Sequence, residues 1–320
     1  MEENNLDVRK LIKFGNSSFV ISLPSNWIKF HELKKGDSIY LNENEKKELI
    51  LTTSKDNRII KKDIVITTGN KDINVLKREI VSAYINSYNL ITIKCNSAHN
   101  PVSEIKKVIQ NLMALEIVEQ TSDTIVAKDF LDIREITINE LVRKMDNITR
   151  SMIEDLKYSR KKDYSKGILS RDEEVNRLSY LIIRVMYFTL QHPNSVHESN
   201  KLTMDKLLNF WDVSLTIESI ADDTKRTSRE FARIKMSPVQ FKKLFEVLSE
   251  IEQFYWDSMK SYYSKDVELA YKLSNNKNVL SVKCNELHEL FWNKKYVPIV
   301  LENFKNIISA IHNIGRRVYS

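Results

Sequence analysis

The stretch that most constrains the fold is residues 8–37, VRKLIKFGNSSFVISLPSNWIKFHELKKGD, where strand-forming and turn-forming residues alternate over a short distance. Apolar Leu11 and Phe14 lie among basic residues. Gly15 opens a turn, because glycine tolerates the positive φ that such turns need. The β-branched and apolar run 19–23 predicts a second strand. The stretch therefore predicts a β-hairpin.

The residues that follow predict one helical turn and a second hairpin. Pro24 sets φ for the first helical position of a turn that carries Trp27 and Ile28. Runs 38–41 and 48–53 then predict two strands that pair with each other. A segment of about fifty residues with so few core positions is marginally stable alone. The simplest way to stabilise such a segment is for two copies to complete each other's sheet.

The order of the glycine-serine turn, the SLP triplet before the tryptophan and the LKKGD loop resembles swapped-hairpin, AbrB/MazE-type DNA-binding domains. It is most similar to the version that begins many archaeal PhoU-family regulators. The resemblance implies a domain over 1–54 through which the protein forms a homodimer. It also implies DNA contact by Arg9, Lys10 and Lys13 on one strand and by Asn16 in the turn.

Basic side chains would supply affinity through phosphates, and arginine or asparagine would supply specificity through base edges. The alternative is a solvated basic strand in a domain that serves only dimerisation. The net charge of +7 permits a nucleic-acid partner. It does not choose between these interpretations, because a basic excess of this size is common in lysine-rich proteins that bind nothing anionic.

The composition is that of a folded globular protein, with 320 residues, 42% hydrophobic and 29% charged. Cys95 and Cys284 lie far apart in no CxxC pair, so a disulfide scaffold or a thiolate zinc site is not expected. The first residues lack the apolar core of a signal peptide. No apolar run approaches the ~18 residues of a membrane span. We therefore expect a cytoplasmic protein without membrane insertion.

Alternating strands and helices are predicted over 55–132, which indicates a small α/β sandwich of helices on a sheet. It contains neither a glycine-rich phosphate loop nor a nucleophile–base pair, so we interpret it as a spacer or dimerisation module. Strands are predicted at 64–68, 90–94, 116–119 and 124–127, with helices after Asp72 and Pro101.

From residue 133 onward, apolar residues recur at spacings of three and four, which predicts helices of similar length. Short loops favour two antiparallel three-helix bundles, over 133–233 and 234–320. Segment 217–223 can be laid over 308–314, which indicates an internal duplication. The helices are predicted near 138–156, 165–191 and 201–229, then from Pro238, over 265–293 and from Pro298 to Tyr319.

This arrangement resembles the PhoU domain, a tandem of three-helix bundles in regulators of phosphate uptake. The expected fold is thus multidomain α+β: a swapped-hairpin β domain, a small α/β sandwich and tandem, mostly α, PhoU-like bundles. The two resemblances together cover nearly the whole chain. They imply DNA as a partner, and a phosphate transporter component or signalling protein as another.

Glu218 and Asp222 are one helical turn apart, so both carboxylates project from one helix face. Glu173 and Glu174, on the preceding helix, are candidates for ligands from the facing side. Such oxygen donors suit a divalent or ferric ion, from Mg, Mn, Fe or Zn. The resemblance implies this role, because PhoU-family bundles hold metals with ExxxD-type motifs, although Asn176 stands where the motif usually has Asp.

The alternative for Glu218 and Asp222 is a solvated pair on a helix surface. The second bundle departs further from the metal motif, because Ser309 and Asn313 stand where carboxylates matching that pair are expected. We therefore expect a metal site in the first bundle only.

No HExxH, GxSxG, Walker or Rossmann pattern occurs, so we expect no enzymatic activity. Four aromatic residues in helical stripes favour core or interface positions over base stacking. They are Trp211, Trp256, Phe291 and Trp292.

The sequence favours a dimeric, DNA-binding regulator of the phosphate response. An adaptor remains open, in which the body gates a phosphate transporter or signalling protein by contact and the head only dimerises. A metal-storage or phosphatase-like bundle is a third alternative.

Overall fold

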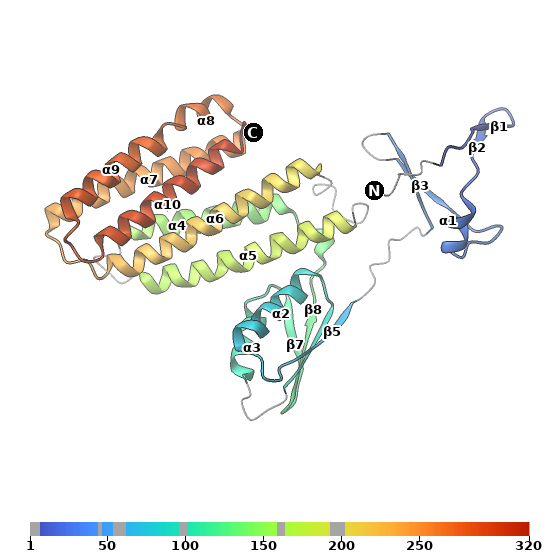
Figure 1. The fold of residues 1–320 in the computed structure, drawn as a ribbon, viewed down its shortest axis with the longest axis horizontal. Helices are drawn as coiled ribbons and strands as arrows, with labels where there is room; N and C mark the ends of the chain where they lie inside the picture. Colours follow the sequence, from blue (N-terminus) through green and yellow to red (C-terminus); the bar gives the residue numbers. More distant parts are fainter. Residues whose placement is uncertain are drawn as a thin grey trace. The chain divides into compact units, whose positions relative to one another are not determined.

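The computed structural model describes residues 7–43, 47–53, 62–95, 101–158, 164–192 and 202–319. The chain divides into two compact units, Met1–Ile60 and Lys61–Ser320 (Figure 1). Its architecture is mixed α+β, as predicted. The predicted boundary between residues 54 and 55 lies outside the described residues.

The first unit contains two antiparallel hairpins, both of which were predicted. β1 (Ile12–Phe14) pairs with β2 (Ser18–Val20) across a turn in which Gly15 has a φ of +70°. β3 (Tyr40–Glu43) pairs with β4 (Leu49–Thr52).

The short helix α1 (Ser25–Phe30) lies between the two hairpins in the chain. The prediction for Pro24 is wrong by one position, because Pro24 is the N-cap, with an extended ψ of 131°, and Ser25 is the first helical residue. The proline ring fixes φ but leaves ψ free, so the same residue suits extended backbone as well as a helix start.

None of the described residues of the first unit is buried. Large apolar side chains are instead exposed on every element of the unit. Phe14 is 70% exposed, Phe30 81%, Leu41 65% and Leu49 68%. Isolated two-stranded hairpins are at best marginally stable in water, so this unit has no core of its own to hold it.

The second unit begins with a four-stranded sheet in the order β5-β6-β8-β7. β5 and β6 are parallel, and the crossover that parallel pairing requires is helix α2. β8 pairs antiparallel with both β6 and β7. The elements are β5 (Asp63–Thr67), α2 (Ile73–Ile85), β6 (Leu90–Lys94), α3 (Val102–Gln110), β7 (Leu115–Gln120) and β8 (Thr124–Asp129).

Helices α2 and α3 cover one face of this sheet. Alternate strand residues Ile91, Ile93 and Ile125 are fully buried against Ile80 of α2 and Ile105 of α3. The side chains between them along the strands lie on the opposite face, because successive strand residues alternate. The predicted α/β pattern is therefore confirmed in its elements and their order.

The rest of the second unit is helical, and within the described ranges no helix combines the length and apolar character that crossing a membrane requires. The helix predicted from Pro238 begins there with a capping box, in which Ser237 and Gln240 bond each other's backbone N–H. The helices are α4 (Ile138–Leu156), α5 (Ser165–Gln191), α6 (Met204–Phe231), α7 (Pro238–Ser264), α8 (Val267–Leu273), α9 (Asn276–Phe291) and α10 (Val297–Arg316), after a short 3₁₀ turn at Ile133–Glu135.

The single helix predicted over 265–293 is wrong, because the chain breaks there into α8 and α9. The Ser274 hydroxyl donates to the carbonyl oxygen of Tyr271 at 2.7 Å, and Asn275 occupies the N-cap position of α9 without a side-chain cap hydrogen bond. A serine hydroxyl competes with helical hydrogen bonds in this way, and asparagine has a low helix propensity. The expectation of helices of similar length is also wrong, since they range from 7 to 28 residues.

Helix α6 packs against α4, α5 and α10, and α10 in turn packs against α7 and α9 (Figure 1). The apolar stripes predicted for these helices are mostly buried. Ile217 and Ala221 of α6 and Ile307 and Ile311 of α10 are at most 1% exposed. The α6–α10 contact therefore joins the first three long helices to the last ones.

A buried ion pair that the sequence did not predict joins the sheet to the helices. Arg184 of α5 and Asp129 of β8 are 2% and 3% exposed, and their Nη1 and Oδ1 atoms are 3.1 Å apart. The guanidinium carbon also lies 4.5 Å from the ring centroid of Tyr84 in α2. A buried pair gains little net stability, but loss of one partner leaves an uncompensated buried charge.

Candidate functional site

Glu218 and Asp222 lie on α6, one turn apart, and both side chains are partly buried. Burial is the main cause that raises the pKa of Glu218 above its ordinary value, followed by the negative charges of Asp222 and Asp172. The pair therefore sits in a locally acidic region between α5 and α6.

Two cations compensate this acidity. The Lys225 ammonium lies 2.5 Å from Asp222 Oδ1 and 2.8 Å from Asp172 Oδ2. The Arg226 guanidinium binds the other oxygen of Asp222 and lies 3.1 Å from Asp223 Oδ1. The Lys225 ammonium thus bridges two helices.

The other two predicted ligands point elsewhere. Glu173 is exposed on α5, and Glu174 pairs with Lys144 of α4 at 2.8 Å. The α5 carboxylate at the site is instead Asp172, which is 3% exposed. Helical spacing could have found it, because Asp172 is four residues before Asn176, and the Asn176 side-chain amide lies 3.4 Å from its carboxylate.

A resident metal does not fit this arrangement as it stands. Among the described residues, no group of three or more His, Cys, Asp and Glu side chains is placed to hold a metal ion. The position between Asp172 and Asp222 is taken by the Lys225 ammonium. Metal binding at Glu173, Glu174, Glu218 and Asp222 stays a prediction.

The four candidate DNA-contacting residues, Arg9, Lys10, Lys13 and Asn16, are all exposed. Arg9 forms an ion pair with Asp7 at 2.5 Å, which a phosphate would have to displace. Both members are exposed, and such surface pairs are weak.

The register of the first hairpin places Lys13 and the apolar residues of β1 on opposite faces, although Phe19 of β2 shares the face of Lys13. Phe14 pairs with Ser18, and Ile12 pairs with Val20, so these four lie on one face. Lys13 lies on the opposite face, across from Phe19. Strand β1 therefore presents an apolar face and a basic face.

The helical aromatics were predicted to lie in the core or at an interface, and the core position is confirmed only for Phe291. Trp211, Trp256 and Trp292 are 42%, 40% and 69% exposed, whereas Phe291 is buried. An interface role for the three tryptophans stays a prediction.

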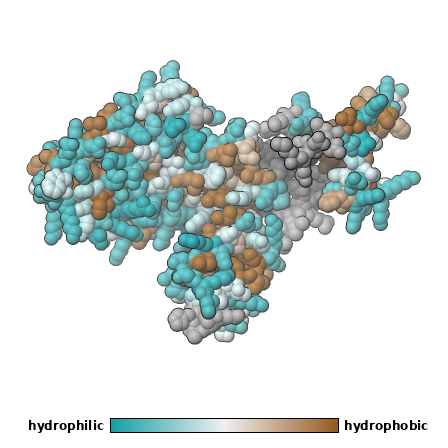
Figure 2. Space-filling model, in the orientation of Figure 1, coloured by the Kyte–Doolittle hydropathy of each residue, from teal (hydrophilic) through white to brown (hydrophobic). Residues whose placement is uncertain are grey.

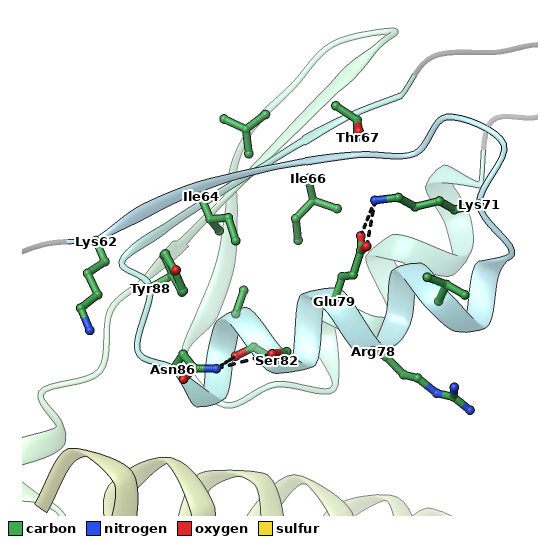
Figure 3. Close-up of a pocket in the computed structure, with 13 residues that line it drawn as sticks. Lys62, Ile64, Ile66, Thr67, Lys71, Arg78, Glu79, Ser82, Asn86 and Tyr88 are labelled. Atoms are coloured by element: carbon green, nitrogen blue, oxygen red, sulfur yellow. Dashed lines mark hydrogen bonds and ion pairs between the residues drawn. The ribbon is translucent and has the colours of Figure 1, made fainter. Parts of the chain in front are cut away.

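A hollow of about 740 Å³ lies between strand β5 and helix α2 (Figure 3). Ile64 and Ile66 of β5 form its apolar floor with Ala83 of α2. Lys71 crosses one end and binds both carboxylate oxygens of Glu79 at 2.8 Å. Sequence reasoning assigned no role to these residues.

Comparison with known proteins gives no relative. No protein-family model, no curated protein and no solved structure matches the chain. The resemblances to AbrB/MazE-type domains and to the PhoU family therefore remain predictions from the sequence.

Proposed function

We propose that the protein is a dimeric, non-enzymatic DNA-binding regulator of phosphate uptake or phosphate signalling. In this proposal residues 1–54 form a swapped-hairpin head shared by two chains. The helices form PhoU-like bundles that bind a partner protein.

The observation that carries the proposal is the absence of buried residues in the described part of the head. Apolar side chains such as Phe14, Leu41 and Leu49 need a partner surface, because their exposure to water is unfavourable. A second head has the same hairpins with the same exposed apolar side chains, so two heads can cover each other's apolar surface. Association would bury the apolar face of the β1–β2 hairpin.

The basic side chains support DNA as the ligand of such a dimer. Lys13 lies on the face opposite Ile12 and Phe14, so it would stay accessible after the apolar face is covered. Two heads related by a two-fold axis would read two half-sites at a fixed separation. A partner bound to the helices would change DNA affinity if it changed that separation.

Fluorescence anisotropy of labelled fragments of the source genome, titrated with the full chain over a range of salt concentrations, tests DNA binding. Each substitution, Arg9→Ala or Lys13→Ala, should lower the slope of log K against log salt by about two in a dimer, because each removes two phosphate contacts. Lys35→Ala is the matched control and should leave the slope unchanged. Absence of binding at low salt would contradict the proposal.

A second candidate function, the adaptor, is favoured by an exposed apolar stripe on α6. Met204, Leu208, Trp211 and Leu215 follow helical spacing and are 54%, 46%, 42% and 40% exposed. Figure 2 shows apolar surface gathered over the part of the helical unit where α5 and α6 lie. Large exposed apolar patches mark sites of protein contact. A dimer that binds no DNA at low salt would favour this function.

A further inference from the structure

Strand β5 lies at the edge of the four-stranded sheet, and among the described strands its one neighbour is β6. Two hydrogen bonds show which backbone groups of β5 point toward β6. The carbonyl oxygen of Lys62 accepts from the N–H of Asn89 at 2.7 Å, and the N–H of Thr68 donates to the carbonyl oxygen of Lys94 at 2.9 Å. Residues 62 and 68 therefore direct their backbone groups toward β6.

Backbone groups alternate in direction along a strand, so residues 64 and 66 also face β6. The N–H and C=O groups of Asp63, Val65 and Thr67 then face the free edge. Such a row of backbone donors and acceptors is a template for another strand.

The groove beside this edge is shaped to receive side chains of an added strand. Helix α2 runs alongside β5 and forms the second wall with Val75, Ser82 and Asn86 (Figure 3). Val75 in this wall is 42% exposed. The Val65 side chain alternates with those of Ile64 and Ile66, so it lies on the opposite face of the sheet, where it is 58% exposed. β-Strand addition uses both features. The free backbone groups supply affinity through hydrogen bonds, and the groove supplies specificity by receiving alternate side chains of the added strand.

The opposite edge of the sheet, β7, is protected in a way that β5 is not. The β7–β8 register shifts between Ile117 and Glu119, and such a bulge discourages further pairing. Exposed Glu116 and Glu119 also place charges there. The β5–β6 register is continuous from Asp63 to Thr67. One edge is therefore blocked and the other is left open.

The charges that line the groove select the ligand. Lys71 and Glu79 neutralise each other. Lys62 and Arg78 also line this groove, and their charged ends reach outward at its rim (Figure 3). Within the described part of the chain, no carboxylate forms an ion pair with either of them. The rim of the groove thus carries two positive charges that no described carboxylate neutralises.

We propose that the β5–α2 groove binds an extended, acidic segment of a partner protein, which joins the sheet as a fifth strand beside β5. Acidic side chains of the segment pair with Lys62 and Arg78. Its β-branched side chains alternate between the two faces, contacting Val75 on the α2 face and Val65 on the other. A second copy of this chain is disfavoured as the occupant, because pairing two β5 edges would bring two cationic grooves together.

The test uses the full chain and a fluorescein-labelled peptide, Glu-Val-Thr-Val-Thr-Val-Glu, acetylated and amidated, in an anisotropy titration. The Val65→Pro variant removes the N–H that faces the free edge and leaves the hydrogen bonds to β6 in place. We expect it to bind the peptide about tenfold more weakly, the effect of losing one or two backbone hydrogen bonds. Val65→Thr, which keeps the N–H, is the matched control, and thermal unfolding checks that both variants fold.

Charge and backbone pairing are tested separately with the same assay. A peptide with lysine in place of both glutamates should bind several-fold more weakly than the acidic peptide at low salt, and Lys62→Ser with Arg78→Ser should remove that preference. A peptide N-methylated at alternate residues should not bind, because it cannot pair with the edge.

Three results would overturn the proposal. They are no saturable binding of the acidic peptide up to about 1 mM, equal binding by the wild type and the folded Val65→Pro variant, and a loss of self-association in Val65→Pro without peptide. The last result would assign the edge to a second copy. None of them bears on DNA binding by the head, which is measured independently.

Discussion

The two units of the chain differ in the burial of their apolar side chains. In the second unit, Ile91, Ile93 and Ile125 are completely buried between the sheet and its two helices. In the first unit, Phe14 and Leu41 on comparable strands are 70% and 65% exposed.

The difference follows from the number of layers that each unit can build. A four-stranded sheet covered by α2 and α3 closes a two-layer core. The first unit has two separate two-stranded sheets and one six-residue helix, which leave each apolar face open. We therefore expect the stability of the second unit to reside in its own contacts, and that of the first to depend on association.

The largest expected effect is in the second unit, at the buried ion pair. Asp129→Ala should lower the free energy of unfolding by about 3–5 kcal/mol, because it leaves the Arg184 guanidinium buried without a counter-charge. Denaturant unfolding measures the loss, which should not depend on protein concentration. Asp129→Ala combined with Arg184→Met should recover most of it. A loss below about 1 kcal/mol in the single variant would contradict this account.

The matching change in the first unit should act on association. Phe14→Ser removes a large apolar side chain from the face that we propose is shared, at a cost of about 2–3 kcal/mol per side chain. The dimer should then dissociate at a concentration about a hundredfold higher or more, as measured by sedimentation equilibrium. Lys10→Ser changes an exposed basic residue in the same segment and should leave the dimer intact. Equal dissociation constants for the two variants would refute a role for this face.

The next effect concerns the charges between α5 and α6. Lys225→Ala removes the ammonium that bridges Asp172 and Asp222, and should lower the free energy of unfolding by about 1–3 kcal/mol at neutral pH. Thermal unfolding in a metal-free buffer measures this. Added Mn²⁺ should restore part of the stability in this variant and not in the wild type, if the ammonium occupies the place of a cation. Stabilisation of the wild type by Mn²⁺ would support a metal site instead.

The smallest effect is at Glu218. Because burial and nearby carboxylates raise the pKa of Glu218 in the fold, the ionised group destabilises the fold at neutral pH. The wild type gains stability as pH falls through that raised pKa. Glu218→Gln should be more stable by about 0.5 kcal/mol at pH 7, comparable to relief of a like-charge helix pair. This stability difference between the variant and the wild type should vanish in acid. A difference that grows in acid would mean that the ionised Glu218 carboxylate stabilises the fold.

The sequence predicts local structure well where local chemistry decides it. Gly15 turns the first hairpin, and Ser237 with Pro238 starts α7, because turn and capping residues act through their own backbone. The helix predicted over 265–293 breaks at Ser274 and Asn275, two residues whose side chains favour helix ends over helix interiors.

The sequence predicts contacts between distant elements poorly. It indicates Glu218 and Asp222, and the spacing from Asn176 also reaches Asp172. It does not choose between Asp172 and its neighbours Glu173 and Glu174, because which α5 carboxylate faces α6 depends on helix rotation. The pairing of Arg184 with Asp129, 55 residues apart, has no local signature. The same is true of the open edge of β5, because strand order in a sheet is a property of the whole fold.

The most direct test of the contrast between the units is hydrogen exchange of the backbone amides in β1 to β4, measured on the full chain across a range of protein concentrations. We expect protection of these amides to rise with concentration as heads associate, while the amides of β6 and β8 exchange at a rate independent of concentration. Strong protection of β1 to β4 that is the same at every concentration would mean that the head folds within one chain, and would contradict the account.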